Sequence, residues 1–341
     1  MHTVYAVNEK EKRKLKFLYD HCGIDTRYSV LPDYSLPANE WQFFPASENL
    51  EPSPSMEKRM KVFQQYAAPL SLEAIQNCLK EFPVQNITHL ITVSCTGMSA
   101  PGLDLELLEL LHLPVTTWRS SVNLMGCYAA IHALKLADII CKADPSANVL
   151  LVCTELCTLH FQNKHTEDNI TSSLLFGDGA AAVLVTGNEE TKGLTIDHFY
   201  SAVSLKGKKD MVWEMSSTGF QMTLSGYIPE LIGEDFDRFV NEALHKKALG
   251  KNDITHWCIH PGGKRILEAI HSSLGFSNGQ FKHSYDVLKE YGNMSSPTIL
   301  FVLERIMRSL DKENNDRIFG AAFGPGLTME TFILSAQKNK E

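Results

Sequence analysis

The run Asn123-Leu-Met-Gly-Cys127-Tyr-Ala-Ala-Ile-His-Ala-Leu134 places one cysteine at the start of a strongly apolar, alanine-rich segment. This composition predicts a central helix over 127–142, with Cys127 in its first turn. Unpaired backbone N–H groups and the positive end of the helix dipole stabilise negative charge at that position. The sequence therefore predicts a lowered pKa for Cys127 and a sulfur that is nucleophilic at neutral pH.

Two further fragments supply chemical partners for this thiol. In Trp257-Cys-Ile-His260-Pro-Gly-Gly263, a histidine ends an apolar, strand-like stretch and precedes a tight glycine turn. In Tyr291-Gly-Asn293-Met-Ser-Ser-Pro297, an asparagine lies in the loop before a helix that begins at the proline. Cys127, His260 and Asn293 are thus a candidate nucleophile, base and amide donor.

Composition limits the class of protein. The chain has 341 residues, of which 44% are hydrophobic, enough for one large core or two fused halves. Its net charge of −8 argues against nucleic-acid binding, which needs a basic face. The eight cysteines form no CxxC pair and no metal-type spacing, so we expect neither a disulfide framework nor a metal site, and we expect a cytoplasmic protein. No apolar run reaches transmembrane length.

Apolar β-branched segments alternate with segments of helical periodicity along the chain. We predict strands over 87–94, 115–120, 149–153, 255–259, 317–323 and 327–335, with paired strands around 173–185. We predict helices over 56–80 (interrupted at Pro69), 103–111, 127–142, 230–248, 264–274, 283–290 and 297–309. This alternation predicts an α/β protein with a mostly parallel sheet covered by helices.

The segments that end at Gly97 and at Gly263 look like equivalent strands in two similar α/β halves with a shared core. We therefore expect one half over 1–200, carrying the cysteine, and another over 201–341, carrying the histidine and asparagine.

Five phrases carry a family resemblance. They are Gly126-Cys-Tyr-Ala129, Leu175-Phe-Gly-Asp-Gly-Ala-Ala-Ala-Val-Leu184, His260-Pro-Gly-Gly263, Tyr291-Gly-Asn-Met-Ser-Ser296 and Phe323-Gly-Pro-Gly-Leu-Thr-Met-Glu330. In this order and spacing, the chain from about residue 15 to residue 336 resembles the type III polyketide synthases, the chalcone-synthase-like group. The resemblance implies the thiolase fold, with two similar βαβαβ-type halves around a layered core.

The resemblance also implies a mechanism. Cys127 would take an acyl group from an acyl-CoA as a thioester, with its thiolate held by a His260 imidazolium. Malonyl-CoA would then lose carbon dioxide, and His260 and Asn293 would donate hydrogen bonds to the enolate oxygen. The enzyme would act as a homodimer on acyl-CoA and malonyl-CoA, and the chemistry requires no metal and no further cofactor.

Other residues acquire roles only through the resemblance. Phe176 would be the gatekeeper between a CoA tunnel and the reaction cavity. The remaining cavity residues would be Cys95, Thr96, Ala100, Cys157, Trp213, Met222 and Ser295. The CoA contacts would be Lys12, Lys16 and Arg265.

The cavity residues favour one substrate class. Small Ala100, with Thr96 and Cys157, resembles bacterial members that hold a long fatty acyl chain in an apolar tunnel, whereas Trp213 would shrink the cyclisation chamber. We therefore expect a fatty acyl-CoA starter and an alkylpyrone or alkylresorcinol product. Cys95 keeps open a malonyl-only synthase that makes a tetrahydroxynaphthalene or phloroglucinol-type product.

Two more distant alternatives remain. A β-ketoacyl-ACP synthase III would share the fold and the three polar residues, but its asparagine usually lies in a Gly-Asn-Thr-Ser context, whereas this chain has Gly-Asn-Met-Ser. A catalytically silent dimerisation partner would require a broken triad.

Overall fold

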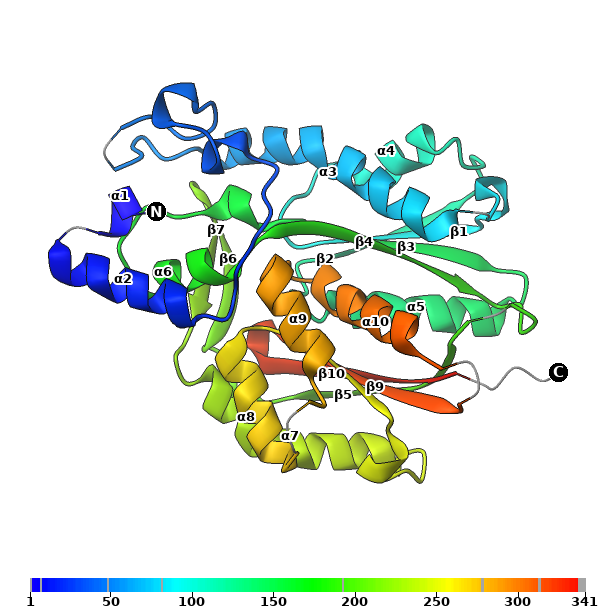
Figure 1. Cartoon of the computed structure of the whole chain (residues 1–341). Helices are drawn as coiled ribbons and strands as arrows, with labels where there is room; N and C mark the ends of the chain where they lie inside the picture. Colours follow the sequence, from blue (N-terminus) through cyan, green and yellow to red (C-terminus); the bar gives the residue numbers. More distant parts are fainter. Residues whose placement is uncertain are drawn as a thin grey trace.

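Two four-stranded sheets lie on either side of two central helices in the computed structural model (Figure 1). The structure describes residues 2–336 except 7, 48, 81, 192, 277–278 and 312–313. The first sheet has the order β2-β1-β3-β4 and the second β5-β10-β9-β8, while β6 and β7 form a separate hairpin. The strands are β1 (His89–Ser94), β2 (Trp118–Asn123), β3 (Asn148–Leu156), β4 (Asp178–Thr186), β5 (Thr195–Val203), β6 (Met211–Ser216), β7 (Gly219–Leu224), β8 (His256–Ile259), β9 (Asp316–Gly324) and β10 (Thr328–Ala336).

The helices form three layers around these sheets. The central helices are α5 (Ala129–Ala143) and α10 (Pro297–Ser309). The outer face of the first sheet is covered by α3 (Met56–Leu79) and α4 (Leu103–Leu110), and that of the second by α7 (Ile228–His245) and α8 (Lys264–Leu274). The other helices are α1 (His2–Tyr5), α2 (Glu9–His21), α6 (Glu167–Leu175) and α9 (Lys282–Tyr291).

Strand β3 shows why the inner strands read as continuous apolar runs. Val149 and Leu151 pack against the central helices, whereas Leu150 and Val152 pack in the outer cluster with α3 and α4. Both faces of the strand are buried, so no polar alternation is left in the sequence. Alanines at 129, 130, 133 and 137 give α5 a narrow apolar surface, which lets both sheets approach it closely.

The two sheets repeat one pairing pattern. β1 runs parallel to β3, which runs antiparallel to β4. In the second sheet β8 runs parallel to β9, which runs antiparallel to β10. The α/β class with two similar halves is thus confirmed, and β1 and β8 are the equivalent strands. The expected boundary at 200/201 falls inside β5, which pairs with β10 and so belongs to the second sheet.

The structure corrects four local predictions. The second sheet is mostly antiparallel, because β5, β10 and β9 are neighbours there. β2 begins at Trp118, three residues later than the expected strand. Residues 173–175 end helix α6, whose N-terminus is capped by Thr166, and a single strand, β4, follows. Helix α3 continues through Pro69, because buried residues on both sides of the proline, including Ala68 and Ser71, hold it in the core.

Among the described residues, no helix is both long and apolar enough to cross a bilayer.

Candidate active site

The first of the three predicted catalytic residues lies in a tight turn rather than in a helix. Cys127 precedes α5 by two residues, and Ala129 N–H donates to the Gly126 carbonyl at 3.0 Å. Gly126 has φ +81°, and a Cβ there would lie 2.2 Å from Cδ of Pro325. The turn therefore needs glycine both for its backbone conformation and for its contact with the loop after β9. The predicted helix over 127–142 begins two residues too early.

Asn293 is brought to Cys127 from the second half of the chain. Its N–H donates to the Leu175 carbonyl at 2.9 Å, and Gly177 N–H donates to the Asn293 carbonyl at 3.0 Å. The Asn293 side-chain oxygen accepts from Ser295 N–H at 2.8 Å, so the amide nitrogen is left to face the thiol. Nδ2 lies 4.0 Å from Cys127 Sγ. The same backbone bridge places Phe176 beside Asn293.

His260 lies directly after β8 and is 1% exposed. The backbone N–H of His260 donates to the Ala321 carbonyl at 2.8 Å. Asn293 Nδ2 donates to the Gly262 carbonyl at 3.4 Å, which ties the histidine turn to the asparagine loop. Within the described chain, neither ring nitrogen of His260 has a hydrogen-bond partner. Both are therefore available to a proton or a ligand.

Burial makes the ring of His260 neutral. It lowers the histidine pKa to about 3, and no carboxylate acts in the opposite direction. The expected imidazolium is therefore wrong for the structure as described. A neutral imidazole can accept a proton, so the ring keeps the capacity of a base.

Burial also reverses the expected shift at Cys127. It raises the pKa of the thiol to about 11, and the nearby Glu155 carboxylate adds to this, while hydrogen bonds from Ser295 and Asn293 oppose it. The predicted lowering is wrong, because the desolvation of a fully buried thiolate exceeds the stabilisation by neighbouring dipoles. The thiol is protonated at neutral pH and needs a base to become a nucleophile.

Glu155 is a functional candidate that the sequence did not single out. It is fully buried at the end of β3 and accepts hydrogen bonds from Cys95 N–H at 2.8 Å, from the Thr96 hydroxyl at 2.8 Å and from the Ser296 hydroxyl at 2.7 Å. Burial raises its pKa. The carboxyl group fixes the segment after β1 against the start of α10. No local pattern marks it, because its partners come from two segments that are distant from it in the sequence.

Two adjoining cavities open beside the thiol. A small cavity of about 30 Å³ is lined by Cys127 and by the predicted residues Cys95, Thr96 and Ser295. A larger cavity of about 340 Å³ extends toward the end of α2. The residues that line both cavities, and therefore lie at their junction, are Cys157, Phe176, Trp213 and Met222. Six of the seven predicted cavity residues, together with Phe176, therefore line one or both cavities, whereas Ala100 lines neither.

Ala100 belongs to an exposed loop after β1 and lines neither of these cavities in the described chain, so its place in the cavity wall stays a prediction. Thr96 uses its hydroxyl on Glu155 and therefore contributes a polar wall. Trp213 is held firmly, because its indole N–H donates to the Cys95 carbonyl at 2.7 Å and its ring stacks on Phe220.

The predicted CoA contacts lie outside both cavities. The side chain of Lys12 is 60% exposed, and its Nζ lies 3.6 Å from Oε1 of Glu9. Lys16 on α2 and Arg265 on α8 are also exposed. Gly23, just after α2, lies against the side chain of Lys264, so the end of α2 is close to the start of α8.

Two further residues that line the larger cavity were not predicted from the sequence. Arg27 lines it and donates to the Ser173 carbonyl. His160 also lines it, and its ring nitrogens contact the Thr96 carbonyl and the Phe220 N–H at 2.7 and 3.0 Å. Burial lowers the pKa of His160 to about 3, so this ring is a neutral part of the wall. Among the described residues, no group of three or more His, Cys, Asp or Glu side chains is arranged to hold a metal ion.

Comparison with known proteins gives a consistent result. Residues 3–189 match the N-terminal domain of the chalcone and stilbene synthases, and residues 203–337 match their C-terminal domain. A putative chalcone synthase of Bacillus subtilis is 30% identical over 98% of this chain and 96% of its own length. A probable polyketide synthase of Dictyostelium discoideum is 34% identical over 96% of this chain, which spans only 10% of that relative.

Solved structures agree with this match. A polyketide synthase from the brown alga Ectocarpus siliculosus superposes with a TM-score of 0.90 at 30% identity, over 96% of this chain and 90% of that one. The 1,3,6,8-tetrahydroxynaphthalene synthase of Streptomyces coelicolor superposes with a TM-score of 0.86 at 28% identity, over 99% of this chain and 93% of that one. The predicted thiolase fold is confirmed. Both domain matches together cover nearly the whole chain, which therefore belongs to the chalcone and stilbene synthase family, the type III polyketide synthases, which are acyltransferases.

Proposed function

We propose that this chain loads an acyl-CoA starter on Cys127 and extends it by decarboxylative condensation with malonyl-CoA. The observation that carries the proposal is the buried approach of Asn293 Nδ2 to Cys127 Sγ, at 4.0 Å. The same amide nitrogen donates to the Gly262 carbonyl at 3.4 Å, two residues from His260, whose ring nitrogens have no partner in the described chain. An acyl group on Sγ would bring its carbonyl oxygen within reach of the amide donor.

Loading begins with a proton transfer. His260 accepts the thiol proton, and the sulfur attacks the acyl carbonyl carbon and expels the CoA thiolate, which takes the proton back from His260. This order follows from a protonated thiol and a neutral imidazole. Asn293 and His260 then donate to the enolate oxygen that forms when malonyl-CoA loses carbon dioxide. The enolate carbon attacks the thioester carbonyl carbon, and Cys127 leaves as the thiolate, which then takes up a proton from solvent.

We further propose a fatty acyl starter that gives an alkylpyrone or alkylresorcinol. The support is the cavity of about 340 Å³, which adjoins the reaction pocket past the small side chain of Cys157. Burying each methylene stabilises a bound chain by about 0.8 kcal/mol, so this space favours longer acyl groups. Lys12, Lys16 and Arg265 remain our candidates for CoA phosphate contacts, and Phe176 for the gatekeeper.

One specific observation favours a second candidate, a malonyl-only synthase. The cavity beside Cys127 is only about 30 Å³, which suits a small starter unit, and Trp213 and Met222 separate it from the larger space. A tetrahydroxynaphthalene synthase is also among the similar solved structures.

Mass spectrometry of the products separates these candidates. Purified protein is given malonyl-CoA alone, or with a ladder of acyl-CoA starters from two to sixteen carbons. The fatty-starter proposal expects alkylated pyrones or resorcinols whose yield rises with chain length. A full yield of product from malonyl-CoA alone, unaffected by added starters, would refute it in favour of the second candidate.

The Cys127→Ala variant tests the common core of both. It should carry no acyl adduct and make no product. We also propose a homodimer, which the molar mass from light scattering tests.

A further inference from the structure

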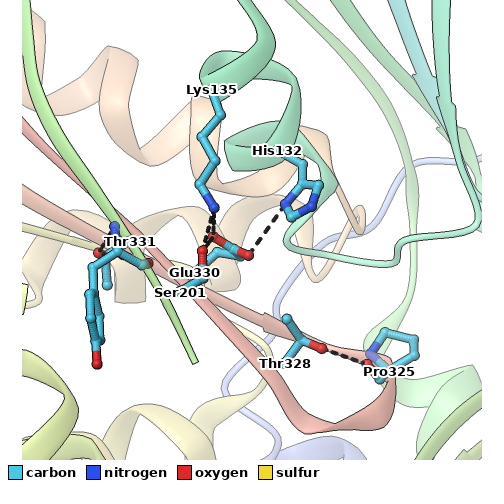
Figure 2. A network of polar contacts seen from close by, with 8 residues as sticks. His132, Lys135, Ser201, Pro325, Thr328, Glu330 and Thr331 are labelled. Atoms are coloured by element: carbon cyan, nitrogen blue, oxygen red, sulfur yellow. Dashed lines mark hydrogen bonds and ion pairs between the residues drawn. The ribbon is translucent and has the colours of Figure 1, made fainter. Parts of the chain in front are cut away.

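A buried carboxylate joins the two halves of the molecule behind the candidate nucleophile. Glu330 on β10 is 1% exposed. Its Oε2 accepts hydrogen bonds from Ser201 Oγ, at 2.8 Å, and from Lys135 Nζ, and its Oε1 lies 3.3 Å from His132 Nδ1 (Figure 2). We call these four residues, His132, Lys135, Ser201 and Glu330, the Glu330 cluster. It lies outside both cavities and has no part in the chemistry proposed above.

The cluster pairs one helix with two strands. Lys135 and His132 are three residues apart on α5, so they project from the same face of the helix. Ser201 is the register partner of Glu330 on the neighbouring strand β5. Burial lowers the pKa of His132, although Glu330 acts in the opposite direction, so the ion pair between Lys135 and Glu330 is the main charge contact of the cluster. The helix that follows Cys127 is thereby tied to the second sheet.

The turn that carries Cys127 has no free space on that side. A Cβ on Gly324 would lie 2.5 Å from the Tyr128 ring and 3.3 Å from the backbone nitrogen of Cys127. Gly126 is equally tight against Pro325. The Tyr128 ring also meets the His132 ring, with centroids 5.6 Å apart. A shift of α5 against β10 would therefore displace the Cys127 turn.

We infer that Glu330 is a positioning residue for Cys127, which acts by locking α5 to β10 so that the Cys127 turn stays seated on the Gly324–Gly326 loop. Glu330 touches no reacting atom and acts through Lys135 and α5. The inference rests on the proposed role of Cys127 as the nucleophile. It differs from a general stabilising role because it affects the turnover of folded enzyme rather than the amount of folded enzyme.

The test compares four variants of the full chain. Glu330→Gln keeps the shape and an acceptor oxygen but removes the charge, Lys135→Met removes the cation, and Lys135→Arg restores it. Asp237→Asn, on α7 and away from α5, breaks the ion pair of Asp237 with Lys251 and is the matched control. Measurements are kcat and KM for malonyl-CoA, the rate of Cys127 alkylation by iodoacetamide from peptide mass spectrometry, and the folded fraction from circular dichroism.

Glu330→Gln and Lys135→Met should each lower kcat by about tenfold or more per folded molecule, with KM within about twofold, because a displaced nucleophile loses alignment more than affinity. Both should change the alkylation rate of Cys127 severalfold, whereas Lys135→Arg and Asp237→Asn should match the parent. Losses that follow the folded fraction alone, or parent kcat and alkylation in folded Glu330→Gln, would overturn the inference.

Alkylation requires no substrate, so the two proposals can fail separately. If Cys127→Ala still makes product, the proposed function fails whatever the Glu330 variants do. If Cys127→Ala is inactive and the Glu330 variants behave like the parent, only the positioning role fails. If folding of Glu330→Gln is lost, the contrast between Lys135→Met and Lys135→Arg decides the result.

Discussion

Removing the imidazole of His260 should expose how strongly burial alone suppresses the nucleophile. Burial raises the pKa of Cys127 from an ordinary value of 9.0 to about 11, which corresponds to about 3 kcal/mol against the thiolate. At pH 7 about one thiol in ten thousand would then be ionised. In His260→Ala we expect the rate of Cys127 alkylation to rise about tenfold for each pH unit from 7 to 10, because the rate follows the thiolate fraction.

The parent protein should react differently. Burial keeps the ring of His260 neutral, so its ring nitrogens are free to receive the thiol proton while the sulfur reacts. We expect the parent to be alkylated at least about a hundredfold faster than His260→Ala at pH 7, with a flatter pH profile, since a positioned base contributes about 10² to 10⁴. The assay is the initial rate of iodoacetamide labelling at Cys127, read from peptide mass spectrometry so that the thiols of Cys95 and Cys157 are counted apart.

A matched control is His245→Ala, which removes an exposed histidine at the end of α7. It should reproduce the parent profile. Coincident profiles for the parent and His260→Ala would show that His260 does not act on the thiol. A plateau below pH 8 in His260→Ala would refute the argument that burial dominates the pKa of Cys127.

Three further predictions concern single side chains. Asn293→Ala should slow carbon dioxide release from malonyl-CoA about a hundredfold to a thousandfold, since it removes one enolate donor; release at the parent rate would leave Asn293 only a structural role. Cys157→Phe should obstruct the junction of the two cavities and lower activity with starters of about twelve carbons while sparing short ones, because the lost burial scales with excluded methylenes; an unchanged chain-length profile in folded protein would place the acyl chain elsewhere. Burial raises the pKa of the Asp178 carboxyl group from its ordinary value of 3.8 to about 6. The folded state therefore binds the carboxyl proton more tightly than the unfolded state does. The free energy of unfolding should fall as the pH rises from about 4 to about 6. Urea titrations at pH 4.5 and 7 should show a smaller decline in Asp178→Asn than in the parent, and equal declines would contradict the assignment.

Local patterns were sufficient for the strands that are buried on both faces. β1, β3, β8, β9 and β10 lie where continuous apolar runs placed them, because such runs leave few alternatives to a buried strand. The pattern failed where a distant partner decides the structure. Pro69 stays helical because its neighbours in α3 are buried, and β5 belongs to the second sheet because β10 is beside it.

The candidate site likewise contains some residues that local sequence could identify and others that it could not. Cys127, His260 and Asn293 stand in distinctive local phrases, so the sequence could nominate them. Glu155, Arg27 and Glu330 could not be nominated as functional, because each gains its partners only when separate segments meet. Ala100, which is expected in the cavity wall, lies in an exposed loop and lines neither cavity in the described chain.

Local sequence was enough to place most of the sheet strands, though not β5, β6 or β7, to indicate two similar halves and to nominate Cys127, His260 and Asn293, because these inferences depend on residue type and spacing along the chain. The protonation of Cys127 and His260, the junction of the two cavities at Trp213 and Met222, and the contacts of Glu330 with α5 exist only in the folded chain. Desolvation, close contact and charge pairing depend on segments that are far apart in the sequence, such as those of Lys135 and Glu330, and that meet only on folding.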